Sequence, residues 1–182
     1  MSNILTDSHT ALWHALVREA EQQGRAPLDE ELESYLVFML MRHVRDGGLG
    51  DHVLALDYLA SLQDHGRLRG EALRDVGDRC LLIAGLYPEQ ARQRLVSLDY
   101  FMSMGIHAYA EVASATRAAL AALYERLASA FGRLVRVLVE LRRLPSGLDP
   151  LDALNRYDLA RADPANDFPG AVVLAPASSR RH

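Results

Sequence analysis

Apolar residues recur along most of the chain at intervals of three and four, which is the spacing of an amphipathic helix. No segment sustains the alternation of a strand, and the apolar run Ala171–Ala175 is too short and isolated to build a sheet. We therefore predict an all-α fold, a single-domain bundle of six to seven helices. The predicted helices, bounded by glycine, proline or capping residues, are 11–23, 29–45, 53–65, 70–87, 97–112, 117–143 and 148–160.

The longest predicted helix, 117–143, carries the most regular pattern in the chain. Its apolar residues alternate four and three apart over three heptads: Leu120, Tyr124, Leu127, Phe131, Leu134, Leu138 and Leu141. We interpret this stripe as the core-facing side of a bundle helix, with the seam of a homodimer or of a partner helix as the alternative. The preceding stretch, 113–116, is either a break or part of a continuous helix, and we favour the break.

The predicted bundle domain covers residues 1–162. Residues 163–182 contain proline, alanine and serine without periodicity and are predicted to form an extended or mobile tail. The segment Met1–Thr10 is polar and has no secretion signal, and no apolar stretch approaches the ~20 residues that cross a bilayer. These features, with the abundant Arg and Ala, predict a soluble bacterial protein of the cytoplasm.

The charged residues narrow the chemistry. The chain contains 20 arginines and no lysine. It can therefore form neither a lysine Schiff base nor a P-loop, which binds phosphate through a lysine. Residues 1–112 hold 17 acidic residues and 10 arginines, whereas residues 113–182 hold 7 and 10. Nucleic-acid binding needs a basic surface, so this distribution makes it an unfavoured hypothesis.

The helix predicted at 70–87 is apolar nearly all round in its second half, as a central helix would be. Gly77 and Gly85 lower its helix propensity, so we expect them to allow the close approach of a neighbouring helix. Cys80, the only cysteine, lies in this apolar stretch. It is predicted to be buried and unreactive.

Two polar pairs are candidates for chemistry. Asp75 and Asp78 lie three apart beside Arg74 and Arg79, and we favour helix-orienting ion pairs over acid–base catalysis. His107 and Glu111 form the second pair and lie four residues apart on one helix. We favour a local hydrogen bond between them over metal binding. The sequence lacks the Glu-x-x-His pairs of di-iron bundles. We therefore predict no metal, no cofactor and no catalytic residue, and lean towards a protein that is not an enzyme.

Three segments resemble a group of bacterial all-helical proteins that has no established activity. They are Gly77–Glu89, Val96–Phe101 and Met104–Tyr109. They carry Gly-Asp, a glycine shortly before aromatic-Pro-Glu, a Ser and Tyr helix start, and Met-Gly before Ala-Tyr. The resemblance lies within residues 77–109, about one-fifth of the chain, and implies a helical fold and no chemistry. If the segments form a ligand site, its polar members are Asp78, Glu89, Arg92, Tyr100, His107 and Tyr109.

The lack of catalytic motifs favours a non-enzymatic helical module that binds another protein, as a regulator or adaptor. The partner is unidentified, and a homo-oligomer is a further prediction. In the tail, the apolar patch Val172, Val173 and Leu174 is the predicted partner anchor. The alternative is an enzyme or sensor that binds a cofactor or small molecule inside the bundle, near Tyr100, His107 and Tyr109.

Overall fold

The computed structural model describes residues 3–45, 57–60, 66–93 and 96–144, and all regular structure in these ranges is helical. The all-α prediction is confirmed for this part of the chain. A helical turn covers residues 57–60. The bounded helices are α1 (Asn3–Gly24), α2 (Glu30–Arg45), α4 (Gly66–Gly85), α5 (Pro88–Gln93), α6 (Leu98–Ala115), α7 (Ala118–Ser129) and α8 (Phe131–Arg143).

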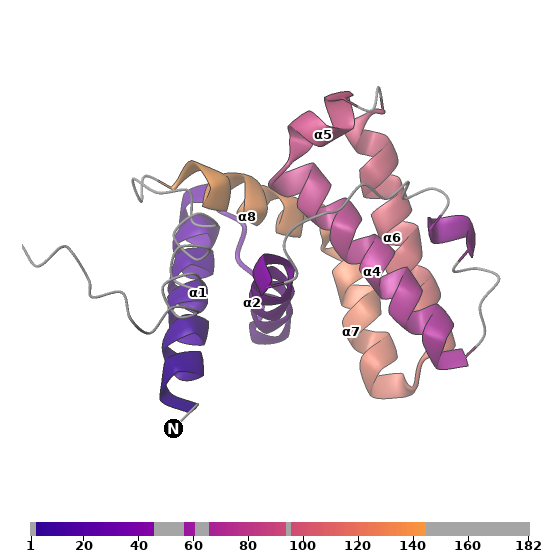
Figure 1. The fold of residues 1–182 in the computed structure, drawn as a ribbon, viewed down its shortest axis with the longest axis horizontal. Coiled ribbons are helices and arrows are strands. Elements are labelled where there is room, and N and C mark those ends of the chain that lie inside the picture. The colour runs from indigo at the N-terminus through magenta and orange to yellow at the C-terminus, as the bar shows by residue number, and fades with distance from the viewer. Residues whose placement is uncertain (1–2, 46–56, 61–65, 94–95, 145–182) are drawn as a thin grey trace, which may run out of the picture.

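Helix α8 connects two groups of helices (Figure 1). Helix α4 packs on α6, and α6 packs on α7, so these three form one side of the molecule. Helix α1 forms the other side and contacts α2, while α8 runs across from α7 and packs on both α1 and α4. Large side chains from both sides are fully buried: Trp13, Leu36, Leu81, Tyr109, Phe131 and Leu134.

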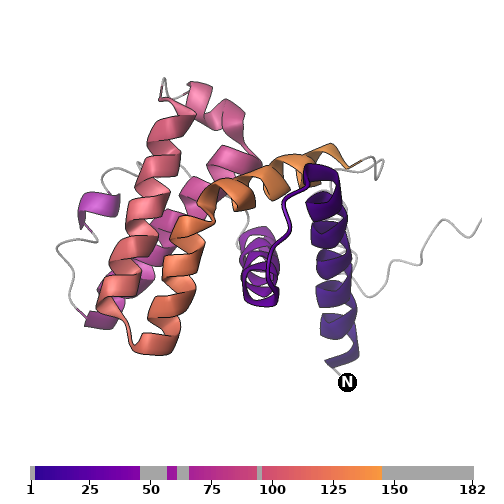
Figure 2. The ribbon, with the colours of Figure 1, turned by 180° about the vertical axis from the view of Figure 1, so that it is seen from behind.

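The helix predicted at 117–143 is not continuous. It divides into α7 and α8 at Ala130, where the chain turns sharply (Figure 2). The stripe continues through the bend because α7 packs on α6 while α8 packs on α1 and α4. Leu127 and Phe131 are fully buried on either side of the bend, whereas Leu120 is 54% exposed. Alanine is a good helix former, so the sequence carries no signal for a bend at Ala130.

Helix α6 begins and ends close to the bounds that were predicted from the sequence. The hydroxyl of Ser97 accepts a hydrogen bond from the Tyr100 N–H at 3.2 Å and caps the helix. The chain leaves the helix at Thr116, which confirms the favoured break at 113–116. Pro88, whose fixed φ suits a first helical position, begins the short helix α5.

The N-terminal helix is longer than predicted. Helix α1 begins at Asn3 rather than near residue 11. The residues before Leu12 are mostly polar and carry no clear apolar period, so the pattern could not show this extension.

Glycines in α4 admit neighbouring helices, as predicted. A Cβ atom at Gly77 would lie 2.5 Å from Cε1 of Tyr109, a residue of α6. A Cβ atom at Gly85 would overlap the side chain of Leu138 on α8. Both positions therefore require the absence of a side chain for close helix packing.

Several predicted features lie outside the described residues. They are the helix at 148–160, the boundary after 162, the tail 163–182 and most of the helix at 53–65. Among the helices that the structure does describe, none is both long enough and apolar enough to cross a membrane.

Candidate functional site

A carboxylate on α4, that of Asp78, is the polar centre of the core. Asp78 follows Gly77 and is only 4% exposed. A carboxylate in such surroundings requires hydrogen-bond donors, because burial removes its water. The donors come from two other helices, α2 and α6.

Three side chains donate to Asp78. The hydroxyls of Tyr35 and Tyr109 lie 2.6 and 2.7 Å from Oδ1. The guanidinium of Arg42 pairs with Oδ2 and is itself 33% exposed, so it connects the buried carboxylate to the surface. Tyr35 and Arg42 belong to α2 and Tyr109 to α6, so Asp78 joins three helices. We call these four residues the Asp78 cluster.

Aromatic rings pack around the buried side of the Asp78 cluster. The ring of Tyr35 meets those of Tyr109 and Tyr124 edge to face, with centroids 6.2 and 6.0 Å apart. Tyr109 also packs on Phe131, with centroids 5.9 Å apart. Since Gly77 admits the Tyr109 ring against α4, this glycine brings the Tyr109 hydroxyl to the neighbouring carboxylate.

The Asp78 cluster is arranged to hydrogen-bond the Asp78 carboxyl group, and it does not lower the pKa of either tyrosine. Burial raises the pKa of Asp78 above its ordinary value of 3.8, and the hydrogen bonds from Tyr35 and Tyr109 and the charge of Arg42 oppose this rise. Burial and the adjacent carboxylate raise the pKa values of both tyrosines well above 10.0. Both tyrosines therefore remain protonated and donate to Asp78 at neutral pH.

The hydrogen bonds of the Asp78 cluster join its own residues to one another. A general acid or base must come within hydrogen-bond reach of a substrate proton, and Asp78 is enclosed with donors on both oxygens. Asp75, the other carboxylate of the predicted pair, is exposed and bonds to the adjacent Arg74 at 3.0 Å. Asp78 bonds instead to Arg42, which lies 36 residues away in the sequence. The two aspartates do not form a common site.

Two of the six predicted ligand residues come together. Asp78 and Tyr109 are bonded in the core. Tyr100 is 46% exposed on α6. His107 is exposed on the same helix and donates from Nδ1 to the Ser103 carbonyl oxygen at 2.7 Å. Tyr100, His107 and Tyr109 therefore do not line one cavity, because Tyr109 is buried and the other two face solvent.

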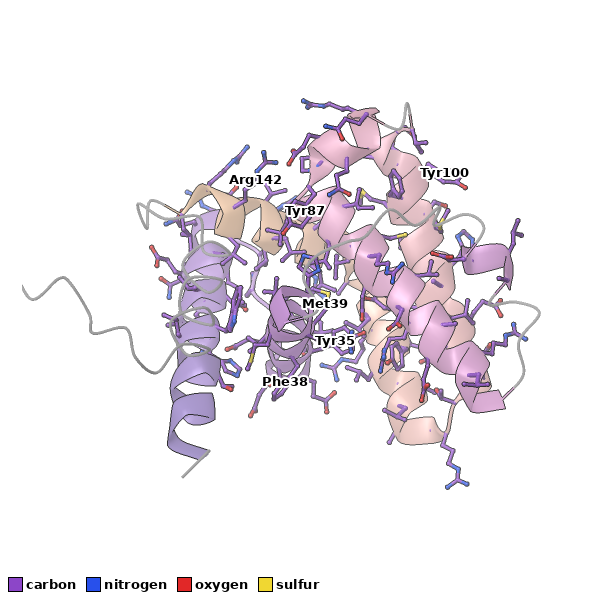
Figure 3. The ribbon with its side chains drawn as sticks, viewed as in Figure 1. Tyr35, Phe38, Met39, Tyr87, Tyr100 and Arg142 are labelled. Atoms are coloured by element: carbon purple, nitrogen blue, oxygen red, sulfur yellow. The ribbon has the colours of Figure 1, made fainter. Side chains whose placement is uncertain are left out.

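The remaining two predicted ligand residues lie on α5 at the surface. Glu89 pairs with Arg142 of α8 at 3.2 Å, and both side chains are 47% exposed. Arg92 is exposed. Figure 3 shows Arg142 on α8, on the side of the molecule near α5. The pair connects two helices at the surface and does not join the Asp78 cluster.

Sequence reasoning missed Tyr35 and Arg42, the two α2 donors to Asp78. They lie seven residues apart, which is two helical turns, and so share one side of α2. This spacing is visible in the sequence, but its meaning depends on Asp78 facing α2. The two donors are 43 and 36 residues distant from Asp78 along the chain.

The predicted histidine–glutamate pair is not formed. Glu111 accepts a hydrogen bond from Arg69 at 2.7 Å, whereas His107 bonds within its own helix. In the described ranges, no group of three or more His, Cys, Asp or Glu is arranged to hold a metal ion.

Cys80 is buried, as predicted. Burial raises the pKa of its thiol to about 12. Because the thiolate is the reactive form, this thiol is a poor nucleophile.

A second buried carboxylate, that of Glu33, lies where α2 meets α1. Its Oε1 accepts hydrogen bonds from His14 Nδ1 at 2.7 Å and from Arg18 Nε at 2.9 Å. The Arg18 side chain is 68% exposed, so this cluster opens to water on one side. It joins two helices at the edge of the core.

Comparison with known proteins adds no assignment to these clusters. No family model, curated protein or solved structure matches the chain. The resemblance to a bacterial helical group stays a prediction. The predicted partner anchor, Val172, Val173 and Leu174, lies outside the described residues.

Proposed function

We propose that this protein is a non-enzymatic helical module that binds another protein, as a regulator or adaptor. The supporting observation is Phe38, a large aromatic side chain that is 59% exposed on α2. Aromatic residues are enriched at the centres of protein interfaces, because they bury a large area with little loss of conformational freedom.

Phe38 is the centre of an outward side of α2 that we call the Phe38 face. It comprises Glu31, Ser34, Phe38 and Met41, which helical spacing places within about 60° of Phe38. Tyr35 and Arg42 lie at similar angles and border this face on the side of Asp78. Glu31 is exposed, and Ser34 and Met41 are partly exposed. In Figure 3, Phe38 lies on the side of α2 away from α8, whereas Met39 lies on the side near α8. An apolar centre with a polar border is typical of a protein interface.

A photo-crosslinking residue at position 38, introduced in the native host, tests this proposal. We expect one dominant protein adduct from position 38 and none from a matched probe at Leu68, which is 66% exposed on α4. The adduct identifies the partner, which is then purified. An adduct with a second copy of the chain would mean that the partner is another copy of this protein, as in the predicted homo-oligomer, and not a different protein.

Binding of the purified partner completes the test. Phe38→Ala should raise the Kd about tenfold or more, as truncation of a central aromatic anchor does. Leu68→Ala should leave the Kd unchanged. An unchanged Kd for Phe38→Ala, or equal adducts from positions 38 and 68, would reject the Phe38 face as the interface.

The tail is the second part of the proposal. We propose that Val172, Val173 and Leu174 contribute an apolar anchor to the same partner. Truncation after Arg161 should then weaken binding, and an equal Kd with and without residues 162–182 would remove the tail from the interface. We also propose a cytoplasmic bacterial location, which fractionation of the native host would check.

A further inference from the structure

The rotation of α2 about its own axis is not selected by apolar burial alone. Leu36–Met41 is an uninterrupted run of six apolar residues, and at about 100° per residue such a run covers the whole circumference of a helix. An ordinary amphipathic helix has one apolar side that selects its rotation. In the centre of α2, Val37 is fully buried and Phe38 is exposed, although both are apolar.

The Asp78 cluster holds α2 at two points. Tyr35 donates to Oδ1 at 2.6 Å and Arg42 pairs with Oδ2, so each carboxylate oxygen binds this helix. The two donors are two turns apart on one side of α2. Phe38 lies between them along the helix, turned outward from them by about 60° and about 40°. Asp78 also accepts a hydrogen bond from Tyr109, but that bond leads to α6 and not to α2.

One other polar contact of α2 is also buried: Nε2 of His43, a residue that is 9% exposed, lies 3.2 Å from the Tyr87 hydroxyl. The remaining polar contacts of α2 lie nearer to water. Glu33 bonds to His14 and Arg18 at the edge of the core. Arg126 of α7 pairs with Glu31 at the N-terminal end of α2, where their side chains are 40% and 66% exposed. Exposed pairs of this kind hold a helix weakly, because water competes for both partners.

We infer that Asp78 is a positioning residue, which selects the rotation of α2 and thereby holds Phe38 at the surface. A rotation by about 100°, the angle of one residue, would carry Val37 to the exposed place of Phe38 and Phe38 to the buried place of Met39. Buried polar contacts select register in this way in other helical assemblies. The biological meaning of this device rests on the proposed partner surface, but the positioning itself is a property of the isolated protein.

Cysteine labelling at position 37 reports the rotation. In a Val37→Cys protein the new thiol is buried while α2 keeps its rotation, since Val37 is 0% exposed. Cys80 in the same molecule is the reference, because it is buried in α4 and reacts only when the core opens. A soluble disulfide reagent labels both thiols, and peptide mass spectrometry gives the two rates. The rate at position 37 divided by the rate at Cys80, which we call the labelling ratio, separates the motion of α2 from unfolding of the whole protein.

Tyr35→Phe and Tyr109→Phe are matched substitutions in this background. Each removes one hydroxyl from Oδ1 of Asp78 and keeps the ring, but only Tyr35→Phe breaks a bond to α2. We expect Tyr35→Phe to raise the labelling ratio about tenfold, the factor expected for one hydrogen bond to a charged group. Tyr109→Phe should leave the labelling ratio unchanged.

A second α2 variant, Arg42→Gln, removes the ion pair to Oδ2 and should raise the labelling ratio as well. It keeps the inference testable if Tyr35→Phe fails to fold. Equal ratios in the α2 variants and in Tyr109→Phe would overturn the inference. No partner is needed, so a raised ratio with no crosslink at position 38 would reject the proposed partner surface alone.

Discussion

Asp78 and Glu33 are both buried carboxylates that join neighbouring helices, but their surroundings differ. Asp78 is 4% exposed and Glu33 is 8% exposed. Donors from α2 and α6 enclose Asp78 in the core, whereas the Arg18 partner of Glu33 is 68% exposed. Water can therefore replace a lost partner of Glu33 more readily than one of Asp78, whose partner Tyr109 is fully buried and whose partners Tyr35 and Arg42 are only partly exposed. The comparison indicates that position, more than residue type, sets the cost of losing a polar contact.

Removal of the two carboxylates gives the largest expected difference. Asp78→Ala leaves two tyrosine hydroxyls and the Arg42 guanidinium without their acceptor, and should lower the free energy of unfolding by about 3–5 kcal/mol. Glu33→Ala should lower it by about 1–2 kcal/mol, because its donors reach water. Urea unfolding measures both. Asp75→Ala, an exposed control on α4, should change the free energy of unfolding by no more than about 0.5 kcal/mol. Equal losses of stability in Asp78→Ala and Glu33→Ala would contradict the distinction between the centre and the edge of the core.

A methyl group beside the Asp78 cluster should have the next largest effect. Gly77→Ala places a Cβ atom 2.5 Å from Cε1 of Tyr109, and should lower the free energy of unfolding by about 1–3 kcal/mol through overpacking. Gly70→Ala is the matched control on α4, because nothing lies within 4 Å of its Cβ position. This substitution should stabilise the protein by up to about 1 kcal/mol through helix propensity. A Gly77→Ala protein as stable as the Gly70→Ala protein would contradict the close packing of α4 on α6.

The helices and the glycine notches could be predicted because they depend on local spacing. Apolar periodicity indicated most helices, and Gly77 and Gly85 stood out as poor helix formers inside an apolar stretch. The division at Ala130 could not be predicted, since its cause is the packing of α7 and α8 on different neighbours. The local sequence does not show which helices α7 and α8 will pack against.

The candidate site was predicted less well, for a related reason. Asp78 and Tyr109 share the resemblance segments with Tyr100 and His107, but closeness in sequence does not place side chains on one side of a helix. Helical rotation buries Tyr109 and exposes Tyr100 and His107. The other donors to Asp78 come from α2, and no local pattern connects α2 with α4.

The burial of Asp78 should also make the stability of the protein depend on pH. Burial raises the pKa of Asp78 above 3.8, so the folded protein holds this proton more tightly than the unfolded chain does. The stability of the wild type relative to Asp78→Asn should therefore be greatest below pH 3.8 and fall as the pH rises through the raised pKa. Urea midpoints of both proteins across this window measure the difference.

Asp29 supplies a control of opposite sign. Burial tends to raise its pKa, but the hydrogen bonds from Arg126 and from the Leu32 N–H, together with the charge of Arg126, outweigh burial and the pKa is lowered. Stability relative to Asp29→Asn should be present above pH 3.8 and be lost as the pH falls through the lowered pKa. If the Asp78→Asn difference followed the same direction as the Asp29→Asn difference, the account of Asp78 as a carboxyl dominated by burial would be wrong.

The smallest effect is expected at the surface. Arg142→Ala breaks the pair with Glu89, in which both side chains are 47% exposed. It should change the free energy of unfolding by about 0.2–1 kcal/mol, with less effect at high salt. A loss as large as that of Asp78→Ala would mean that α5 is held to α8 by more than an exposed ion pair.

A double-mutant cycle between Asp78→Asn and Arg42→Gln tests whether the buried carboxylate holds α2 against α4 through a bond between the two residues. Urea unfolding of the wild type, both single variants and the double variant gives the coupling free energy. We expect a coupling of about 1–3 kcal/mol. Losses that add within about 0.5 kcal/mol would show that the two residues act independently and that Asp78 does not hold α2 through Arg42.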